Sequence, residues 1–240
     1  MEVIILLDYK KVKSKEILEH IPFFKGLSKE EKNTVFEGVE ILKVKNGDVI
    51  FETGDSADRL YILVEGKIKI YKNLVDGREQ ILYIYSSGDF VGGLNLLKDD
   101  EYRYIGEVIE GGLVATLSKD KFDEVILNNP IVLRRILEKS YHRIRLAEGL
   151  IDRLFSGTAD GKVASLLLDL ADIFGEETKD GILLNFPISR EEMASFAGTS
   201  RETITRKLHQ FKDRGYLKVL GNKKILLVNI DKIEEIAGEY

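Results

Sequence analysis

The 240-residue chain contains no cysteine, which excludes disulfide bonds, thiolate-bound zinc sites and iron–sulfur clusters. Long hydrophobic runs are also missing. The longest one near the N-terminus, Val3 to Leu7, is too short for a signal peptide or a membrane-spanning helix. Hydrophobic residues make up 44% and charged residues 32%, a balance typical of globular proteins. These features predict a soluble cytoplasmic protein with no membrane association.

The usual signatures of catalysis are missing as well. The chain has no P-loop, nucleophile elbow or dinucleotide-binding fingerprint. The strand-rich segment 39–117 has no histidine, whereas metal-using β-barrel enzymes need clustered histidines and carboxylates inside the barrel. The sequence therefore predicts that the chain is not an enzyme and has no metal site.

The net charge of −5 is unevenly distributed along the chain. The segment 189–224 has nine Lys and Arg residues against four acidic residues, a local net charge of +5, which leaves −10 for the remainder. A basic face on an otherwise acidic protein indicates a polyanion bound at one end. Charge alone leaves open the alternative of a solvated basic surface without a ligand.

The segment from about Val39 to Leu117 has the pattern of many short strands. Apolar residues alternate with others, and the turns are marked by repeated Gly-Asp pairs. These pairs stand at 47–48, 54–55 and 88–89. Such spacing predicts a β-sandwich or barrel. Before it, Lys15 to Phe36 is predicted to be helical, with Ser28 and Glu31 as a capping box.

After Pro130 the pattern changes to that of a long helix with a heptad seam. Its members recur at alternating spacings of four and three residues: Leu133, Leu137, Ser140, Ile144, Ala147, Ile151 and Leu154. This regularity predicts a two-stranded parallel coiled coil and hence a homodimer. The alternative is an amphipathic helix packed on its own barrel. The small polar residues 156–158 are predicted to form a hinge after this helix.

The C-terminal part continues with a second amphipathic helix from Lys162 to Phe174 and a loop from Gly175 to Gly181. A helix-turn-helix follows. Ser189 and Glu192 form a capping box, Gly198 suits the left-handed conformation of a tight turn, and Ser200 caps the next helix. Five apolar residues are predicted to hold the two helices together: Met193, Ala197, Ile204, Leu208 and Phe211. A short strand pair is expected around Gly221-Asn222.

Four polar residues near the start of the second helix share one exposed side, at about 100° per residue. We call them the recognition strip: Arg201, Glu202, Thr205 and Arg206. Arginine can donate two hydrogen bonds to guanine, and glutamate can accept one from cytosine, so the strip predicts reading of the DNA major groove. Further DNA contacts are expected from Ser189, Thr199, Ser200 and Lys223. A salt-bridged solvent face would explain the charges but not the capped pair of helices.

Three motifs resemble the catabolite-activator/FNR (CRP/FNR) superfamily of transcription regulators. They are Gly88 to Gly92 in the barrel, Asn129-Pro130 before the long helix, and Ser200 to Arg206 in the recognition helix. The resemblance extends from about Ile21 to Val228. It implies an α+β fold with a cyclic-nucleotide-binding-type barrel (a double-stranded β-helix or jelly roll), a dimerisation helix and a winged helix-turn-helix. The corresponding domains would be 1–129, 130–157 and 158–240.

The resemblance also implies the DNA target and a further partner. Arg201, Glu202 and Arg206 match the catabolite-activator branch, which reads GTGA-like half-sites in palindromic double-stranded DNA. Thr205 stands where the FNR branch has a hydroxyl residue, so its TTGAT-like sites remain an alternative. The segment 175–181 corresponds to a loop that touches RNA polymerase in activating relatives.

The ligand of the barrel is predicted to differ from cAMP. In cAMP-binding relatives a glutamate binds the ribose and an Arg-Ser pair binds the phosphate, whereas this chain has Gly93, Arg103 and Tyr104 at the matching positions. The two adenine-binding positions on the dimer helix are Ala147 and Glu148. Losing these partners would cost roughly 1–3 kcal/mol for each buried polar group left unpaired.

The residues that remain suggest a small carboxylate or dicarboxylate effector. Arg103 and the backbone N–H groups of Gly92, Gly93 and Leu94 would form an anion site. Arg143 and Glu148 fall where the nitrogen-control branch of the superfamily places the residues that bind 2-oxoglutarate. The alternative is that Arg103 forms a structural salt bridge and that no small effector binds. A ligand-binding adaptor without DNA function would leave the basic segment unexplained.

Overall fold

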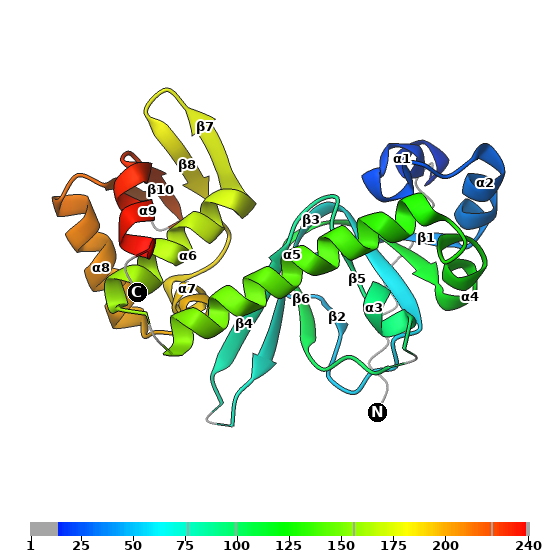
Figure 1. Cartoon of the computed structure of the whole chain (residues 1–240), viewed down its shortest axis with the longest axis horizontal. Coiled ribbons are helices and arrows are strands. Elements are labelled where there is room, and N and C mark those ends of the chain that lie inside the picture. The colour runs from blue at the N-terminus through cyan, green and yellow to red at the C-terminus, as the bar shows by residue number, and fades with distance from the viewer. Residues whose placement is uncertain (1–13, 76, 99, 156, 222, 239–240) are drawn as a thin grey trace. The chain divides into compact units, whose positions relative to one another are not determined.

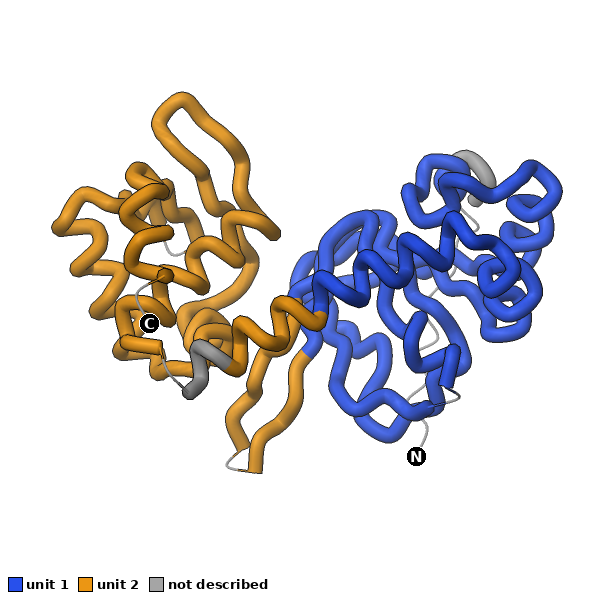
Figure 2. The backbone as a smooth tube through the Cα atoms, viewed as in Figure 1, with its two compact units in different colours: residues 1–70, 84–143 blue, residues 71–83, 144–240 orange. Residues whose placement is uncertain are grey.

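The computed structural model describes residues 14–238 except positions 76, 99, 156 and 222 (Figure 1). These residues form two compact units (Figure 2). The first unit comprises Met1–Ile70 and Ile84–Arg143, and the second comprises Tyr71–Tyr83 and Ile144–Tyr240. The chain therefore passes between the units at three places, two of them within the strands that flank residues 71–83.

The first unit is built on an antiparallel sheet with the strand order β1-β6-β3-β4, on which β2 pairs with β6 and β5 pairs with β3. The strands are β1 (Val39–Val44), β2 (Val49–Phe51), β3 (Arg59–Asn73), β4 (Glu79–Tyr85), β5 (Phe90–Val91) and β6 (Ile105–Ser118). Leu60, Ile62, Ile68 and Ile70 of β3 are buried, as their alternation predicts. The strand-rich segment and its position are thus confirmed.

The repeated Gly-Asp pairs form turns that share the same side-chain to backbone hydrogen bond. Each aspartate carboxylate accepts a hydrogen bond from the backbone N–H three residues earlier: Asp48 from Lys45 at 2.7 Å, Asp55 from Glu52 at 2.8 Å and Asp89 from Ser86 at 3.0 Å. Such side-chain to backbone bonds stabilise a turn where strand pairing is interrupted. The motif that marked the turns in the sequence therefore also holds them.

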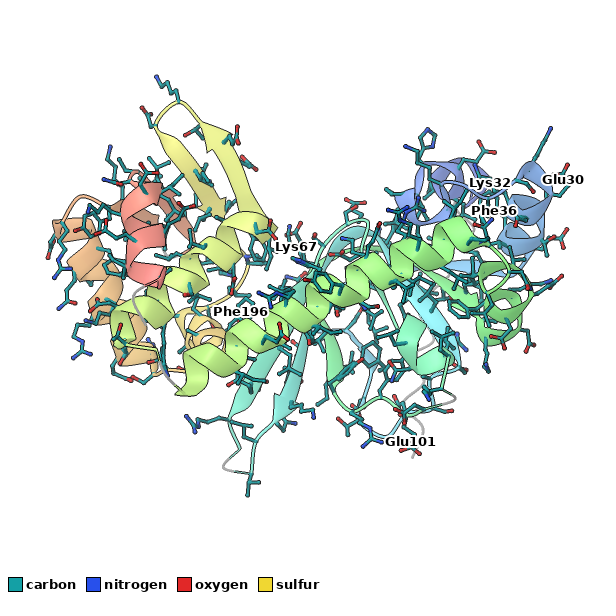
Figure 3. The ribbon with its side chains drawn as sticks, viewed as in Figure 1. Glu30, Lys32, Phe36, Lys67, Glu101 and Phe196 are labelled. Carbon is teal, nitrogen blue, oxygen red and sulfur yellow. The ribbon has the colours of Figure 1, made fainter. Side chains whose placement is uncertain are left out.

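The N-terminal segment predicted to be helical, with an N-cap at Ser28, consists of three helical pieces separated by short non-helical stretches. These are α1 (Ser14–His20), a 3-10 turn η1 (Pro22–Phe24) and α2 (Lys29–Glu37). Pro22 lacks the N–H that would continue α1. The capping box of Ser28 and Glu31 is confirmed at the start of α2. Phe36 of α2 is labelled in Figure 3. Its ring packs edge-on against that of Phe24, with the centroids 5.6 Å apart.

The remaining helices of the first unit follow the strands. They are α3 (Gly93–Leu96), α4 (Lys119–Lys121), the π-helical η2 (Phe122–Ile126) and the long α5 (Pro130–Phe155). Side chains from α1, η1, η2 and α5 share one core with the strands, which includes Phe23, Leu60, Phe122 and Val132.

The Asn129-Pro130 motif begins α5 and ties it to α2. The Asn129 Oδ1 accepts from the N–H groups of Ile131 and Val132, both at 3.1 Å, while its Nδ2 donates to the two carboxylate oxygens of Glu31 at 3.0 and 3.2 Å. Proline at the first helical position has no N–H to leave unpaired. This motif therefore fixes where the long helix starts.

The second unit contains the C-terminal helices and a four-stranded antiparallel sheet with the order β7-β8-β10-β9. Its elements are α6 (Ala159–Phe174), β7 (Gly175–Thr178), β8 (Gly181–Asn185), α7 (Arg190–Ala197), α8 (Arg201–Asp213), β9 (Leu217–Gly221), β10 (Lys224–Leu227) and α9 (Ile230–Gly238). The helix predicted at 162–174 and the strand pair near Gly221 are confirmed. The segment 175–181 was expected to be a loop and instead forms the β7–β8 hairpin, because β8 pairs with β10 and buries Leu184.

Candidate nucleic-acid interface and ligand site

The helix-turn-helix forms as the capping residues predict. Ser189 Oγ accepts from the N–H of Glu192 at 3.2 Å, and the Glu192 carboxylate accepts from the N–H of Ser189 at 2.7 Å. Gly198 ends α7 with φ 64° and ψ 46°, a left-handed conformation that favours glycine. Ser200 then caps α8 by accepting from the N–H of Thr203 at 3.2 Å. The turn is therefore fixed by local contacts on both sides.

The apolar contacts between the two helices are also as predicted. The five residues expected to hold them together are all buried: Met193, Ala197, Ile204, Leu208 and Phe211. Two polar contacts from α6 add to this packing. Lys207 Nζ lies 2.8 Å from the Asp160 carboxylate, and Lys162 Nζ lies 3.5 Å from the carbonyl of Gly198. The orientation of α8 thus depends on α6 as well as on α7.

The four residues of the recognition strip are exposed. Its two guanidinium groups, on Arg201 and Arg206, make no hydrogen bond or ion pair with any residue that the structure describes. The Thr205 hydroxyl donates to the carbonyl of Arg201 at 2.9 Å. A hydrogen bond from its own backbone N–H lowers the pKa of Glu202, so this carboxyl is ionised at neutral pH and accepts hydrogen bonds. The strip therefore presents donors and an acceptor outward, where the salt-bridged alternative would have paired them.

The other predicted DNA contacts lie around this strip. Ser189 and Ser200 are the two N-cap residues, and Thr199 lies in the turn between the helices. Lys223 is exposed beside β10 and donates from Nζ to the carbonyl of Pro187 at 2.7 Å. In helix-turn-helix proteins the turn and the helix N-termini approach the phosphates, so these positions suit backbone contacts.

The predicted anion site lies at a tight turn of the first unit. Gly92 has a φ of 98°, and a Cβ there would come within 2.8 Å of both the Arg59 carbonyl and the Tyr102 hydroxyl. Gly93 is buried, and a Cβ on it would lie 3.3 Å from the Phe90 ring. Leu94, by contrast, is 46% exposed. The backbone here can approach its neighbours closely only because both residues are glycine.

The structure does not place the Arg103 side chain against this turn. Its side chain is 75% exposed and lies 3.6 Å from the Asp100 carboxylate. Tyr104 instead points inward, where its hydroxyl donates to Asn95 at 3.3 Å. The neighbouring Tyr102 was not predicted as a site residue, and its ring stacks on Phe51 at a centroid distance of 4.0 Å.

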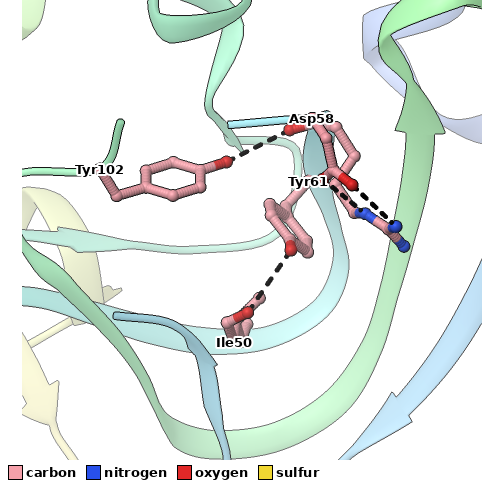
Figure 4. Close-up of polar contacts among 5 residues, drawn as sticks. Ile50, Asp58, Tyr61 and Tyr102 are labelled. Atoms are coloured by element: carbon pink, nitrogen blue, oxygen red, sulfur yellow. Dashed lines mark hydrogen bonds and ion pairs between the residues drawn. The ribbon is translucent and has the colours of Figure 1, made fainter. Parts of the chain in front are cut away.

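Tyr102 belongs to an aromatic cluster inside the barrel together with Phe51, Tyr61 and Tyr104. The Tyr102 hydroxyl donates to the Arg59 carbonyl at 3.2 Å, and the Tyr61 hydroxyl donates to the Ile50 carbonyl at 3.4 Å (Figure 4). Burial raises the pKa of Tyr102. The signal in the sequence is two tyrosines two residues apart, which fall on the same face of an extended chain.

The predicted effector residues on α5 make contacts within their own units. The Arg143 guanidinium donates to the carbonyl of Phe90 and lies 4.5 Å from the ring centroid of Tyr85. One turn earlier, Lys139 forms an ion pair of 2.7 Å with Asp89, a contact that the sequence analysis missed. Glu148 pairs with Arg145 at 2.7 Å. Arg143 is thus part of a clamp between α5 and the Gly88–Gly92 turn.

Other kinds of site find no support in the described residues. They contain no group of three or more His, Asp or Glu side chains that could hold a metal ion. Among the same residues, no helix is long and apolar enough to cross a membrane.

Two family models match the chain. Residues 41–129 match a cyclic nucleotide-binding domain, and residues 161–236 match a Crp-like helix-turn-helix domain. The chain belongs to the CRP/FNR family of transcription regulators. It is therefore a DNA-binding transcription regulator with a cyclic-nucleotide-binding-type domain, and the predicted fold class is confirmed.

Individual CRP/FNR proteins resemble it over most of their length. A CRP-like cAMP-activated global transcriptional regulator of Mycobacterium tuberculosis is 27% identical over 218 residues, 91% of this chain and 97% of that protein. The anaerobic regulatory protein of Bacillus subtilis is 29% identical over 187 residues, 77% of this chain and 78% of that protein.

Solved structures share the fold. FixK2 from Bradyrhizobium japonicum has a TM-score of 0.74 at 24% identity and covers 84% of this chain and 98% of its own. A mutant of CooA from Carboxydothermus hydrogenoformans has a TM-score of 0.75 at 18% identity and covers 97% of this chain and 99% of its own.

Proposed function

We propose that this CRP/FNR-family regulator acts in the cytoplasm as a homodimer that reads an inverted repeat with GTGA-like half-sites. The single observation that carries the proposal is the recognition strip at the start of a capped helix, which is exposed and has two guanidinium groups without a partner among the described residues. Arginine forks onto the O6 and N7 of guanine, and Glu202 accepts from the N4 amine of cytosine. Sites of the TTGAT type are the competing target.

The dimer is supported by an uncovered apolar stripe along α5. Leu137, Ile144 and Ile151 of the predicted heptad seam are 65%, 55% and 55% exposed. Water-exposed aliphatic side chains at this spacing favour the packing of α5 against the α5 helix of a second copy of the chain. Two copies of α8 would then reach successive major grooves about 34 Å apart.

DNA binding by purified protein tests the proposed operator. The measurement is fluorescence anisotropy with palindromic duplexes that contain GTGA or TTGAT half-sites, or a scrambled sequence. Arg206→Ala should lower the affinity for the GTGA duplex about tenfold or more and remove the preference for its guanine, because each bidentate contact contributes about 1–3 kcal/mol of discrimination.

Arg214→Ala is the matched control, since Arg214 is an exposed arginine at the opposite end of α8. It should keep the sequence preference. An Arg206→Ala variant that still prefers GTGA over the scrambled duplex to the full extent would refute the proposed reading.

We further propose that the effector is a small carboxylate or dicarboxylate rather than cAMP. The proposal is supported by the glycine at position 93, where a larger side chain would crowd the Phe90 ring, and by the exposed guanidinium of Arg103 near that turn in sequence. Arg143 would exchange its bond to the Phe90 carbonyl for a bond to the ligand. Isothermal titration with cAMP, 2-oxoglutarate and related dicarboxylates tests this. Heat from a dicarboxylate that Arg103→Ala abolishes supports it, and a flat trace across the acids contradicts it.

An effector-independent regulator is the second candidate. It is favoured by a specific observation: the Arg103 side chain already lies near Asp100, and Arg143 is already bonded within its own unit. In that case no ligand would change the DNA affinity. Contact with RNA polymerase through the β7–β8 hairpin would support activation of transcription in either case.

A further inference from the structure

The hairpin between β3 and β4 belongs to the same compact unit as the winged helix-turn-helix. Residues 71–83 form one unit with residues 144–240, although the strands on either side of them continue into the sheet of the first unit (Figure 2). This hairpin contacts α7, the first helix of the helix-turn-helix, through three hydrogen bonds.

Ser195 of α7 is the centre of this contact. Its hydroxyl donates to the Glu79 carbonyl at 2.7 Å and accepts from the Ile81 N–H at 2.9 Å. The serine thus bonds to the β4 backbone as a neighbouring strand would, with one donor and one acceptor. An alanine at this position would leave both backbone groups of β4 without these partners.

Gln80 adds a third bond at the end of α7. Its Nε2 donates to the Ser195 carbonyl at 2.6 Å, and the Gly198 N–H donates to the same carbonyl at 3.3 Å. The last carbonyls of a helix lack partners within the helix, so an outside donor stabilises its final turn. The Gln80 bond therefore fixes the point at which α7 turns into α8.

The docked hairpin leaves the DNA-facing side open. Arg201, Glu202 and Arg206 are exposed while all three bonds are made. A cavity of about 480 Å³ lies beside the contact, lined by residues from Leu74 to Gln80 and from Glu191 to Thr199. The contact is thus compatible with DNA binding, and Ser195 is among the residues that line this cavity.

We propose that Ser195 is a positioning residue through which the β3–β4 hairpin holds the helix-turn-helix in its DNA-competent geometry. The inference rests on the DNA-reading role of the recognition strip and adds a residue that does not itself touch DNA. The hairpin residues 71–83, α7 and α8 all belong to the second unit, so the proposed positioning acts within that unit.

The test compares three variants of the full-length chain. Ser195→Ala removes the hydroxyl, Ser195→Thr keeps it, and Ser165→Ala on α6 is a control serine outside the contact. We expect Ser195→Ala to bind the GTGA duplex about tenfold more weakly, as expected when bonds that pre-order a binding surface are lost. Ser195→Thr and the control should stay within about twofold of wild type. Restoration by threonine separates positioning through the hydroxyl from a general loss of packing.

Amide hydrogen exchange gives a second readout that needs no DNA. The Ile81 N–H should exchange about tenfold faster in Ser195→Ala than in wild type, because its acceptor is gone, and at the wild-type rate in Ser195→Thr. Unchanged Ile81 exchange, or DNA affinity that is unchanged or raised in Ser195→Ala, would overturn the proposal. If the wild-type protein binds none of the three duplexes, the proposed operator is contradicted. The exchange rate of the Ile81 N–H still tests the contact between Ser195 and the hairpin in that case.

Discussion

At the scale of single residues, several polar side chains form hydrogen bonds to the backbone that stabilise turns and helix ends. Asp48, Asp55 and Asp89 hold turns, and Ser189 and Ser200 begin helices. Short polar side chains are favoured in turns and at helix N-termini, because they accept hydrogen bonds from backbone N–H groups that have no partner in a helix or sheet. Asn129 is the most connected of them, since it bonds both to α5 and to Glu31.

Removal of the Asn129 side chain should therefore destabilise the first unit. We expect Asn129→Ala to lower the free energy of unfolding by about 1–2 kcal/mol at pH 7, the usual cost of a lost helix cap. The hydrogen bond from Asn129 is the largest cause that lowers the pKa of Glu31 in the folded state. The Asn129–Glu31 bond therefore stabilises the folded state fully above the ordinary glutamate pKa of 4.5, and this stabilisation is lost as the pH falls below it.

Urea unfolding at pH 7 and at pH 3 measures both effects. The difference between wild type and Asn129→Ala should be smaller at pH 3. A double-mutant cycle with Glu31→Ala gives the coupling at pH 7, and additive effects there would contradict the bond. The bond between Asn129 and Glu31 was not predictable from the sequence, because the two residues are 98 positions apart. The capping box that contains Glu31 gives no indication of Asn129, and the Asn129-Pro130 motif gives none of Glu31.

At the scale of elements, the long helix α5 has two different sides. Val132, Ile136 and Ser140 are buried, whereas Leu137 and Ile144 are more than half exposed. The heptad pattern predicted the seam, but Ser140 lies on the buried side and bonds back to the Ile136 carbonyl at 2.7 Å. The side chain of Leu154 lies outside the described residues.

A charge in the exposed stripe should separate the proposed dimer. Ile144→Asp would bury two unpaired carboxylates near the twofold axis, at a cost of several kcal/mol, and so weaken dimerisation at least about 100-fold. Analytical ultracentrifugation over a concentration series measures this. His142→Asp makes a comparable change at an exposed position off the seam and should leave the dimer intact. A dimer of unchanged affinity in Ile144→Asp would contradict the proposed interface.

Local elements were largely predictable and the ligand site was not. Helix caps, apolar periods and turn residues depend on neighbours within a few positions, so α7, the turn and α8 match their prediction closely. The direction of a side chain in an irregular turn depends on distant packing. Hence the sequence left open whether Arg103 binds an anion or forms a structural salt bridge, and the stacking of Tyr102 on Phe51 was not expected.

At the scale of the whole molecule, the uneven charge should control DNA affinity. Each phosphate neutralised by Lys or Arg contributes a slope of about −0.9 to the plot of log affinity against log salt concentration. Lys223→Ala should make this slope shallower by about 1–2 for a dimer, with little change in sequence preference. Lys121→Ala in the first unit, where Lys121 pairs with Glu124, is the control and should leave the slope unchanged. An unchanged slope in Lys223→Ala would remove this residue from the phosphate contacts.

The edge strand β7 has a consequence for behaviour at high protein concentration. In the described part of the sheet it pairs only with β8, so its outer backbone groups are free to pair with a strand of another molecule. Glu176 and Glu177 stand in the middle of this edge, and all four of its residues are exposed. Two copies that approached edge to edge would bring like charges together, so this edge discourages self-association into fibrils.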